Sequence, residues 1–352
     1  MLPGSARTRA MLQTFFRRCV MLTELIRWFK SKKGQQTLII FLFTIIPLLL
    51  LFVFTYLPFA EMVKFSFMKL KYTTPVENRQ FVGLKNYVDV FSRDDCFSAL
   101  KLSLYYVVGA LIQLAIALYL ATVLSFKVRL GNLFKGFMFF PYLISGIAIG
   151  FIFKFFYTRG FVFDTILCWC GFDLENLPYW LKDQSINNWS LVATSVWRYF
   201  GQNMVLFLGA IMSIDPSLYE SAALDGANRW NQFLHIILPG IKPVLTLNLI
   251  LSITGSLSAF EQPFVITGGS NGTGTYFVIM NTIAHTTQKV GLASAMAVVL
   301  LVIIMVCTAF QRVVMNQLFP SDELILKRAK RRAELENGSG IESRIYLHFN
   351  KR

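Results

Sequence analysis

Charged side chains are scarce in this sequence, and so are the residues from which metal centres are built. Lys, Arg, Asp and Glu together make up 15% of the 352 residues, against about 25% in soluble globular chains. With 55% hydrophobic residues, the composition argues against both a water-soluble protein and a disordered one. The three histidines lie in different segments and the five cysteines form no paired CxxC motifs, so neither a zinc site nor a disulfide framework is expected.

The motifs of common catalytic sites are also missing. There is no GxxxxGK[ST] phosphate loop, no HExxH and no GxSxG, which argues against ATP hydrolysis, zinc proteolysis and serine hydrolysis by this chain. The glycine-rich run 268–275 has no lysine and follows no predicted strand, so it is interpreted as a turn region. A membrane enzyme is therefore the weakest of the functional classes considered.

Long apolar runs dominate what is present. A hydrocarbon core about 30 Å thick requires about 20 apolar helical residues, and six segments qualify. They are 37–60, 99–125, 133–157, 190–214, 244–267 and 292–315. Gly146 and Gly150 in the third have the spacing of a small-residue helix-packing motif.

Basic residues alternate between the loops. Segment 1–36 carries eight Lys/Arg and one acid, loop 61–98 six and five, loop 126–135 three and none, loop 158–189 two and four, and the tail from Arg312 nine basic residues. This positive-inside pattern explains the net charge of +15 without nucleic acid, and it predicts a multi-pass membrane protein with both termini cytoplasmic. Segment 11–29 is expected to lie on the anionic inner leaflet, where it contacts membrane lipid.

The loop between the fourth and fifth spans, 215–243, carries the most specific pattern. Asp215 is a good N-cap before Pro216, and Gly226 suits the left-handed end of a short helix. Asn228 is expected to cap a second helix, on which Trp230, Phe233, Leu234 and Ile237 share one apolar face. The pattern predicts a helix–turn–helix on the cytoplasmic membrane surface. On periodicity alone, an amphipathic connector that only shields the bundle remains an alternative.

The run ESAALDG (220–226), followed after nine residues by IxLP (236–239), resembles the EAA loop of ABC-importer permeases. Ser221 stands where the family usually has alanine. The segments GLKNY (83–87) with Phe91, the stretch before the loop, and Phe264 with TGG (267–269) resemble the carbohydrate branch, the maltose-type permeases. The resemblance covers about residues 37–316.

The resemblance implies an all-α polytopic membrane protein with six transmembrane helices and the type I ABC-importer core. It places a permease domain at 37–316 in the bacterial inner membrane, between the basic segment 1–36 and the polar tail 317–352 that the charge pattern indicates. The implied partners are a second homologous permease, two ATPase subunits that hold ATP and Mg, and an extracellular or periplasmic substrate-binding protein, with no cofactor bound by this chain. The residues implied to couple to the ATPase are Glu220, Ser221, Ala222, Gly226, Ile236, Leu238 and Pro239.

Arg198 and Glu261 lie well inside predicted spans and are functional candidates, because a charge deep in the bilayer is costly. Lys154 lies near the outer end of the third span, where its side chain is expected to reach the membrane surface. Arg198 and Glu261 lie about 12 and 9 Å below the same membrane surface, which allows an ion pair. Ser195, Arg198, Tyr199 and Gln202 share one face of the fourth span, and Ser258 lies one turn from Glu261 on the fifth. In the family these spans line the substrate path, and hydroxyl, amide and aromatic groups suit a sugar. The same polar face would also serve to hold helices together through hydrogen bonds, and both interpretations stay open.

The leading prediction is the permease subunit of an ATP-driven importer for a carbohydrate, preferably an oligosaccharide. The same architecture importing glycerol phosphate, a polyamine or an anion is the nearest alternative. A self-contained secondary transporter or channel is the second class.

The predicted topology can be tested by cysteine labelling in a chain whose native cysteines are replaced. A membrane-impermeant reagent added outside is expected to tag cysteines placed at Asn176 and Asn271 and to leave Asn132 and Asn228 untagged, because the first two lie in the predicted external loops. Labelling at Asn228 in sealed cells, with Asn176 as the positive control, would contradict the assignment.

Overall fold

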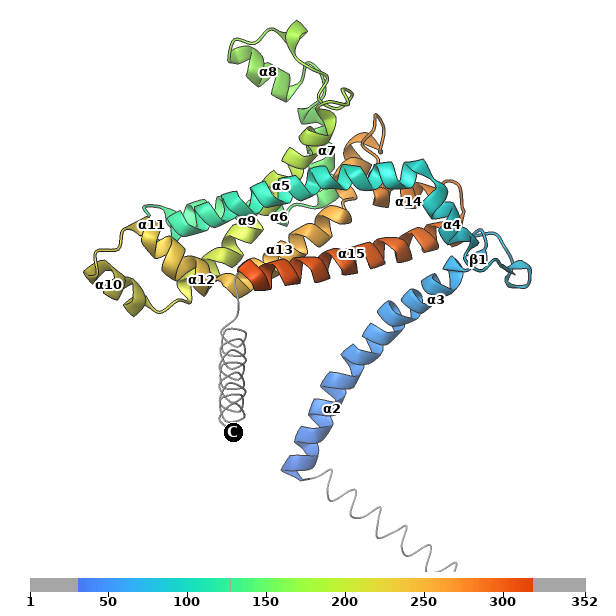
Figure 1. The fold of residues 1–352 in the computed structure, drawn as a ribbon, viewed down its shortest axis with the longest axis horizontal. Helices are drawn as coiled ribbons and strands as arrows, with labels where there is room; N and C mark the ends of the chain where they lie inside the picture. The colour runs from blue at the N-terminus through green and yellow to red at the C-terminus, as the bar shows by residue number, and fades with distance from the viewer. Residues whose placement is uncertain (1–30, 127, 319–352) are drawn as a thin grey trace, which may run out of the picture. The chain divides into compact units, whose positions relative to one another are not determined.

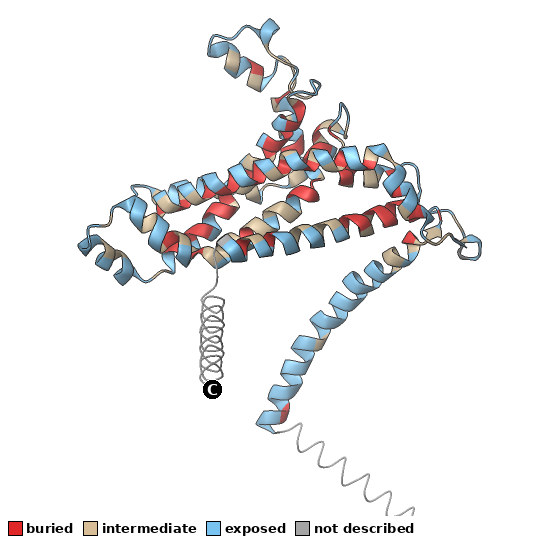
Figure 2. Cartoon of the chain, viewed as in Figure 1, coloured by how far each residue is buried: buried red, intermediate tan, exposed pale blue. Residues whose placement is uncertain are grey.

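The computed structural model describes residues 31–318 except residue 127, and the chain divides into two compact units, residues 1–65 and 66–352. In the first unit, one helix runs without interruption from Lys32 to Ser66 and contains the predicted first span. The Ser31 hydroxyl accepts a hydrogen bond from the Gly34 N–H at 3.1 Å and caps its start. No residue of its most apolar stretch is buried (Figure 2). A helix that is apolar all round needs lipid or another subunit as its surroundings.

This helix has three parts in the structure. They are α2 (Lys32–Leu51), the π-helical η1 (Phe52–Tyr56) and α3 (Leu57–Ser66).

The elements of the second unit that the structure describes are helical apart from one small hairpin (Figure 1). Its elements are β1 (Met68–Lys69), η2 (Val76–Asn78), β2 (Gln80–Phe81), α4 (Lys85–Ser92), α5 (Asp94–Ser125), α6 (Gly131–Leu143), α7 (Gly146–Phe156), α8 (Val162–Trp169), η3 (Leu174–Asn176), α9 (Asn187–Met212), α10 (Pro216–Leu224), α11 (Arg229–Gln232), η4 (Phe233–Ile237), α12 (Leu238–Gly240), α13 (Lys242–Leu257), η5 (Pro263–Thr267), α14 (Tyr276–His285) and α15 (Val290–Leu318). The antiparallel pair β1–β2, with Met68 opposite Phe81, is an exception to the all-α prediction.

The core of this unit is the packing of α5 along α9 and α13. Small residues allow the close approach: Ala117 and Ala121 of α5 are 0% exposed, and a Cβ at Gly109 would overlap the Val192 side chain of α9. On its other side, α9 meets α6 at Gly201, where a Cβ would overlap the Met138 carbonyl. Small residues at helix crossings are how membrane helices gain van der Waals contact.

The third predicted span is not one straight helix. It is divided into α6 and α7, which meet at 96°, because Ile144 and Ser145 leave the helical conformation between them. Helix α7 then packs on η5, where Cβ atoms at Gly146 and Gly150 would collide with Glu261 and Val265. The glycine spacing therefore marks a close crossing, as the small-residue motif suggested.

The fifth predicted span, 244–267, is also interrupted. Helix α13 ends at Leu257, and the chain resumes as the π-helical η5 at Pro263. Residues 258–260 are not helical, and the helix resumes at Glu261, with Gln262 already in the right-handed helical conformation. Pro263 therefore stands in the first turn of the resumed helix, where its missing N–H is tolerated. At its other end, α13 meets the segment Arg229–Gly240 at 72°.

The fourth predicted span corresponds to α9, whose 26 residues extend about 39 Å at 1.5 Å per residue. Within the described residues, three helices are long and apolar enough to cross a membrane, or five when each bent pair counts as one. Helix α9 is not among these helices, because polar residues such as Asn188, Thr194 and Arg198 lower its hydropathy. These three are buried inside the protein, so the polar face of α9 does not require contact with lipid.

Short connecting elements form the two ends of this bundle (Figure 1). Helices α10, α11 and α12 lie at one end, and α4 with the β1–β2 hairpin lies at the other. Helix α10 has no buried residue. The glycine-rich run 268–275 forms turns in which Gly268, Gly269 and Gly272 have positive φ, as the turn interpretation predicted.

The glycine crossing between α6 and α9 can be tested with a matched pair of variants. Gly201→Val is expected to destabilise the folded protein by about 1–3 kcal/mol, the usual cost of overpacking, because the obstacle is a backbone carbonyl. Gly209→Val makes the same change in the same helix, where nothing lies within 4 Å of the added Cβ. Thermal unfolding of the purified protein, followed by size-exclusion fluorescence, is expected to show a lower midpoint for Gly201→Val alone; equal midpoints would refute the crossing.

Candidate functional site

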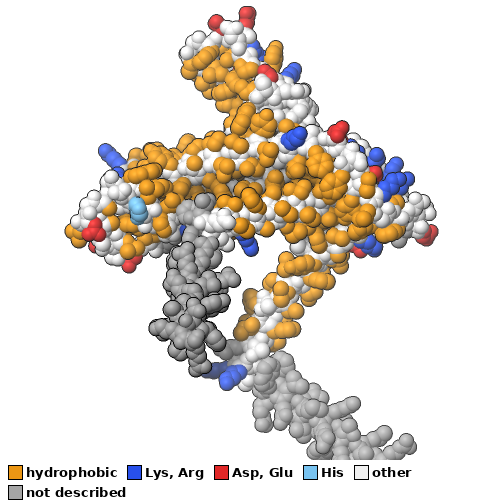
Figure 3. All heavy atoms as spheres, viewed as in Figure 1, with side chains coloured by type: hydrophobic (Ala, Val, Ile, Leu, Met, Phe, Trp, Pro, Cys, Tyr) orange, Lys and Arg blue, Asp and Glu red, His pale blue; other side chains and the backbone are white. Residues whose placement is uncertain are grey.

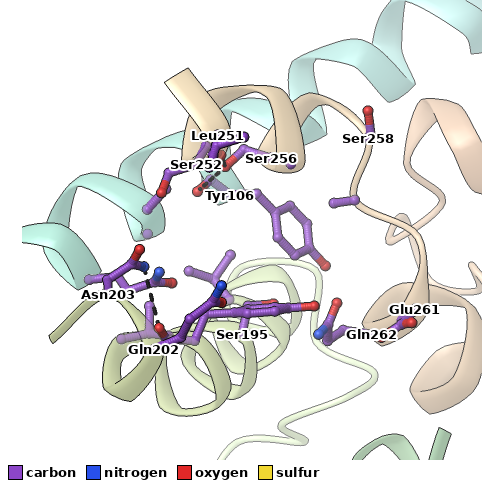
Figure 4. A pocket seen from close by; sticks show the side chains of 18 of the residues that line it. Tyr106, Ser195, Gln202, Asn203, Leu251, Ser252, Ser256, Ser258, Glu261 and Gln262 are labelled. Carbon is purple, nitrogen blue, oxygen red and sulfur yellow. Dashed lines mark hydrogen bonds between the residues drawn. The ribbon is translucent and has the colours of Figure 1, made fainter. Parts of the chain in front are cut away.

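A polar cavity of about 410 Å³ lies between α5, α9 and the segment from α13 to η5 (Figure 4). Each of the three helical segments contributes one wall. The polar and charged side chains that line it are Tyr106, Gln113, Ser195, Tyr199, Gln202, Asn203, Asn248, Ser252, Ser256, Ser258, Glu261 and Gln262.

The structure brings five of the six predicted path residues to this cavity. Ser195, Tyr199 and Gln202 line it from α9, and Ser258 and Glu261 line it from the break after α13. Arg198, the sixth, is not among the lining residues. Its guanidinium instead lies against the edge of the site, 4.9 Å from the centre of the Tyr199 ring.

Arg198 and Glu261 form the predicted ion pair. The two partners differ in burial: the Arg198 side chain is 11% exposed, whereas that of Glu261 is 47% exposed. A Cβ at Gly146 would overlap the Glu261 carboxylate, so the start of α7 passes directly over the pair. Glycine at this position leaves the space that the pair occupies, and Glu261 is the partner that faces the cavity.

The wall formed by α5 was missed in the sequence, as were several residues on α13. Tyr106 and Gln113 are spaced i, i+7 on α5, and Asn248, Ser252 and Ser256 are spaced i, i+4, i+8 on α13. Each set forms a polar stripe on a helix that is otherwise apolar, so the stripe was a usable signal. The Ser256 hydroxyl joins the two walls by donating to the Tyr106 carbonyl at 3.0 Å.

Several polar groups of the cavity wall are buried without a protein partner. The Tyr106 hydroxyl, the Ser195 hydroxyl and the Asn248 side-chain nitrogen find no hydrogen-bond partner among the described residues. Leaving a buried donor or acceptor unpaired costs about 1–3 kcal/mol. These groups therefore offer hydrogen bonds to a polar solute that enters the cavity. Of the described residues that line it, Glu261 alone is charged, and Arg198 neutralises it.

The second site is the loop at the far end of α9. The predicted caps are present: Asp215 accepts from the Ser217 N–H at 2.9 Å and starts α10, and Asn228 accepts from the Asn231 N–H at 2.8 Å and starts α11. The backbone hydrogen bond from Ser217 holds the pKa of Asp215 below its usual value. Gly226 has φ +78°, the left-handed conformation predicted for the turn.

The predicted coupling residues divide into an exposed and an anchored group. Glu220, Ser221 and Gly226 are exposed and Ala222 is half-buried, whereas after the turn Ile236 and Leu238 are half-buried and Pro239 is exposed. The buried residue of this second segment is Ile237, which packs into the core of α5 and α9. Of the predicted apolar face, Trp230 stays 64% exposed and stacks on Phe233 with 5.5 Å between ring centres.

Helix α10 thus projects from the bundle while the segment after it is fixed to the core. Its apolar residues Leu218 and Leu224 are 52% and 91% exposed. Exposed leucines beside an exposed carboxylate on a short, capped helix are typical of a surface that binds a protein partner.

Comparison with known proteins shows the family to which this chain belongs. Residues 113–318 match the family described as "Binding-protein-dependent transport system inner membrane component". The probable ABC transporter permease protein YurN of Bacillus subtilis is 32% identical over 286 residues, which cover 79% of this chain and 96% of that protein. The arabinooligosaccharides transport system permease protein AraP of Bacillus subtilis is 33% identical over 235 residues, 64% of this chain and 73% of that protein.

A chain in the crystal structure of a bacterial ABC transporter for import of the acidic polysaccharide alginate superposes with a TM-score of 0.70 at 20% identity, covering 81% of this chain and 98% of that one. This likeness concerns the fold. The family match and the relatives establish the identity: the chain belongs to the inner membrane components of binding-protein-dependent transport systems.

Proposed function

We propose that this chain is the membrane-spanning permease subunit of an ATP-driven ABC importer for a carbohydrate, preferably an oligosaccharide. The observation that carries the proposal is the cavity between α5, α9 and α13, whose wall presents unpaired hydroxyl and amide groups beside aromatic rings. Sugars offer matching hydroxyl groups and apolar ring faces. The relative AraP, named for arabinooligosaccharide transport, supports the same substrate class.

Charge separates this proposal from its nearest alternatives. Glycerol phosphate or an inorganic anion requires an unpaired cation at the site, and the described lining residues include none. A polyamine requires free carboxylates, and Glu261, the one acid among the lining residues that the structure describes, is held by Arg198. A self-contained transporter has no use for an exposed α10, and membership of a binding-protein-dependent family favours an assembly with separate components.

We place the coupling function on the loop 215–243. In the proposed assembly, α10 docks on one of two ATPase subunits, with Glu220 pairing with a basic group there and Ser221 and Ala222 allowing close contact. ATP and Mg belong to those partners, and this chain binds no cofactor. A second homologous permease completes the path, and a periplasmic or extracellular binding protein delivers the sugar. Both termini are proposed to be cytoplasmic; segments 1–30 and 319–352 lie outside the described residues.

The turn at Gly226 provides a direct test of coupling. Gly226→Val forces a β-branched residue into a left-handed conformation, at a cost of about 1–2 kcal/mol, and is expected to reduce sugar uptake at least tenfold in vesicles containing the whole complex. Gly171→Val is the matched control, because Gly171 also has positive φ and open space around it but lies far along the chain from the loop. Equal amounts of both variants must reach the membrane. Uptake and substrate-stimulated ATP hydrolysis that are normal in Gly226→Val would refute the coupling role.

The ion pair beside the cavity separates a structural role from one in the sugar path. Glu261→Met leaves the more buried Arg198 unpaired and is expected to lower the folded yield more than Arg198→Met does, since an uncompensated buried charge is strongly destabilising. The double variant is expected to recover the yield but not the uptake, because Glu261 faces the cavity.

Folded yield from membranes and uptake per folded complex are the two measurements. The exposed pair Lys64 and Glu61, replaced in the same way, is the control and is expected to change neither. Full uptake by the double variant would remove Glu261 from the path, and unchanged yields in both single variants would show that the pair is unimportant for folding.

A further inference from the structure

A second cavity, of about 660 Å³, lies at the end of the bundle opposite α10, between the hairpin, α4 and the start of α15. Its lining is mainly basic and polar. Its charged residues are Lys69, Lys71, Lys85, Arg93, Lys289 and Asp89. Lysine and arginine side chains gather at this end of the molecule (Figure 3).

The positive charge of this cavity is largely uncompensated. None of its four lysines forms an ion pair with a described residue. Arg93 is held by Asp95, with 2.9 Å between Nε and a carboxylate oxygen, so it contributes little free charge. Asp89 is the single acid among the described lining residues. An excess of three positive charges therefore surrounds a space that also contains hydroxyl and amide donors.

Helix α4 joins this cavity to an exposed apolar stripe. Leu84, Val88 and Phe91, spaced i, i+4, i+7 from its N-cap onward, are 64%, 60% and 60% exposed. Lys85 follows Leu84 in the sequence and Asp89 follows Val88, and both line the cavity. The cavity face therefore lies about 100° around the helix from the apolar stripe.

The orientation of α4 is fixed by its third face. The Asn86 side-chain nitrogen donates to the Ser66 carbonyl at 2.8 Å and to the Met68 carbonyl at 3.0 Å. Val90, one turn on, is 1% exposed and packs with α14 and α15 residues. The apolar stripe and the basic face therefore cannot turn inward.

The stripe continues onto a membrane helix. The Phe91 ring lies 5.7 Å from that of Phe97, which is on the first turn of α5 and is 39% exposed. Helix α4 also packs against α15, and both α5 and α15 are long and apolar enough to cross a membrane. The basic cavity thus lies where two spans begin, beside an apolar surface that extends along one of them.

We propose that this end of the protein binds an anionic phospholipid, with its phosphate in the lysine-lined cavity and its acyl chains along Leu84, Val88 and Phe91. A cationic site beside an apolar stripe matches the two halves of such a lipid, whereas an acidic protein surface would leave the stripe uncovered. This proposal does not depend on the sugar proposed for the cavity between α5, α9 and α13. Under the proposed topology the lipid belongs to the outer leaflet.

The test is direct measurement of bound lipid on the purified complex by native mass spectrometry, with phosphatidylglycerol titrated against a phosphatidylcholine background. Lys85→Gln and Lys289→Gln are each expected to weaken phosphatidylglycerol binding about fivefold, the effect of one lysine at an anionic surface. Lys182→Gln removes an exposed lysine outside this cavity and is the matched control, expected to change nothing. Equal binding by all three variants would overturn the proposal.

Two further arms separate the lipid from other ligands. Val88→Asn keeps every lysine and is expected to weaken lipid binding while leaving the weak binding of soluble glycerol phosphate unchanged. Displacement of the lipid by millimolar glycerol phosphate, or loss of binding-protein-stimulated ATP hydrolysis in Lys85→Gln with lipid binding intact, would instead assign the cavity to a soluble phosphate or to a protein. Because lipid binding is read without transport, its outcome does not depend on the proposed sugar path.

Discussion

A bilayer cannot hydrate polar side chains, and the fold around α9 is a response to that constraint. Thr194 and Arg198 are buried on this helix, and each polar group lost from water costs free energy unless it is paired. Thr194 bonds back to the Ser190 carbonyl at 3.0 Å, and Arg198 takes Glu261 as its partner. The polar face of α9 therefore determines which segments surround it: α5 on one side and the broken end of α13 on another.

Close packing then depends on glycine where these segments cross. Gly109 lets α5 approach Val192, Gly201 lets α9 approach the α6 backbone, and Gly146 lets α7 pass over the ion pair. In lipid, helix association gains little from the hydrophobic effect and relies on such contact. The cavity lies between these tight crossings, and its wall carries polar groups, such as the Tyr106 and Ser195 hydroxyls, that have no partner among the described residues.

Local rules were sufficient for much of this structure. The caps at Asp215 and Asn228 and the left-handed turn at Gly226 follow from residue chemistry within a few positions, and the sequence predicted them. Six path residues were predicted from their helical spacing on two spans, and five of the six line the cavity. The 96° bend between α6 and α7 was not predicted, since it is set by packing on η5, a segment more than 100 residues later. The wall formed by α5 was missed because two polar residues, Tyr106 and Gln113, mark it within a long apolar run, and their i, i+7 spacing was the available signal.

The connection between the two sites lies in α13. The segment after Gly226 is fixed to the α5–α9 core through Ile237 and Ile241, both at most 1% exposed, and α13 begins at the next residue. Its far end breaks at Ser258, directly before Glu261 in the cavity wall. In the proposed coupling, a displacement of the loop would reach the cavity along a single helix of 16 residues. The breaks at Ile241 and Ser258 therefore bound the helix that leads from the loop to the cavity wall, and they separate it from the segments fixed at either end.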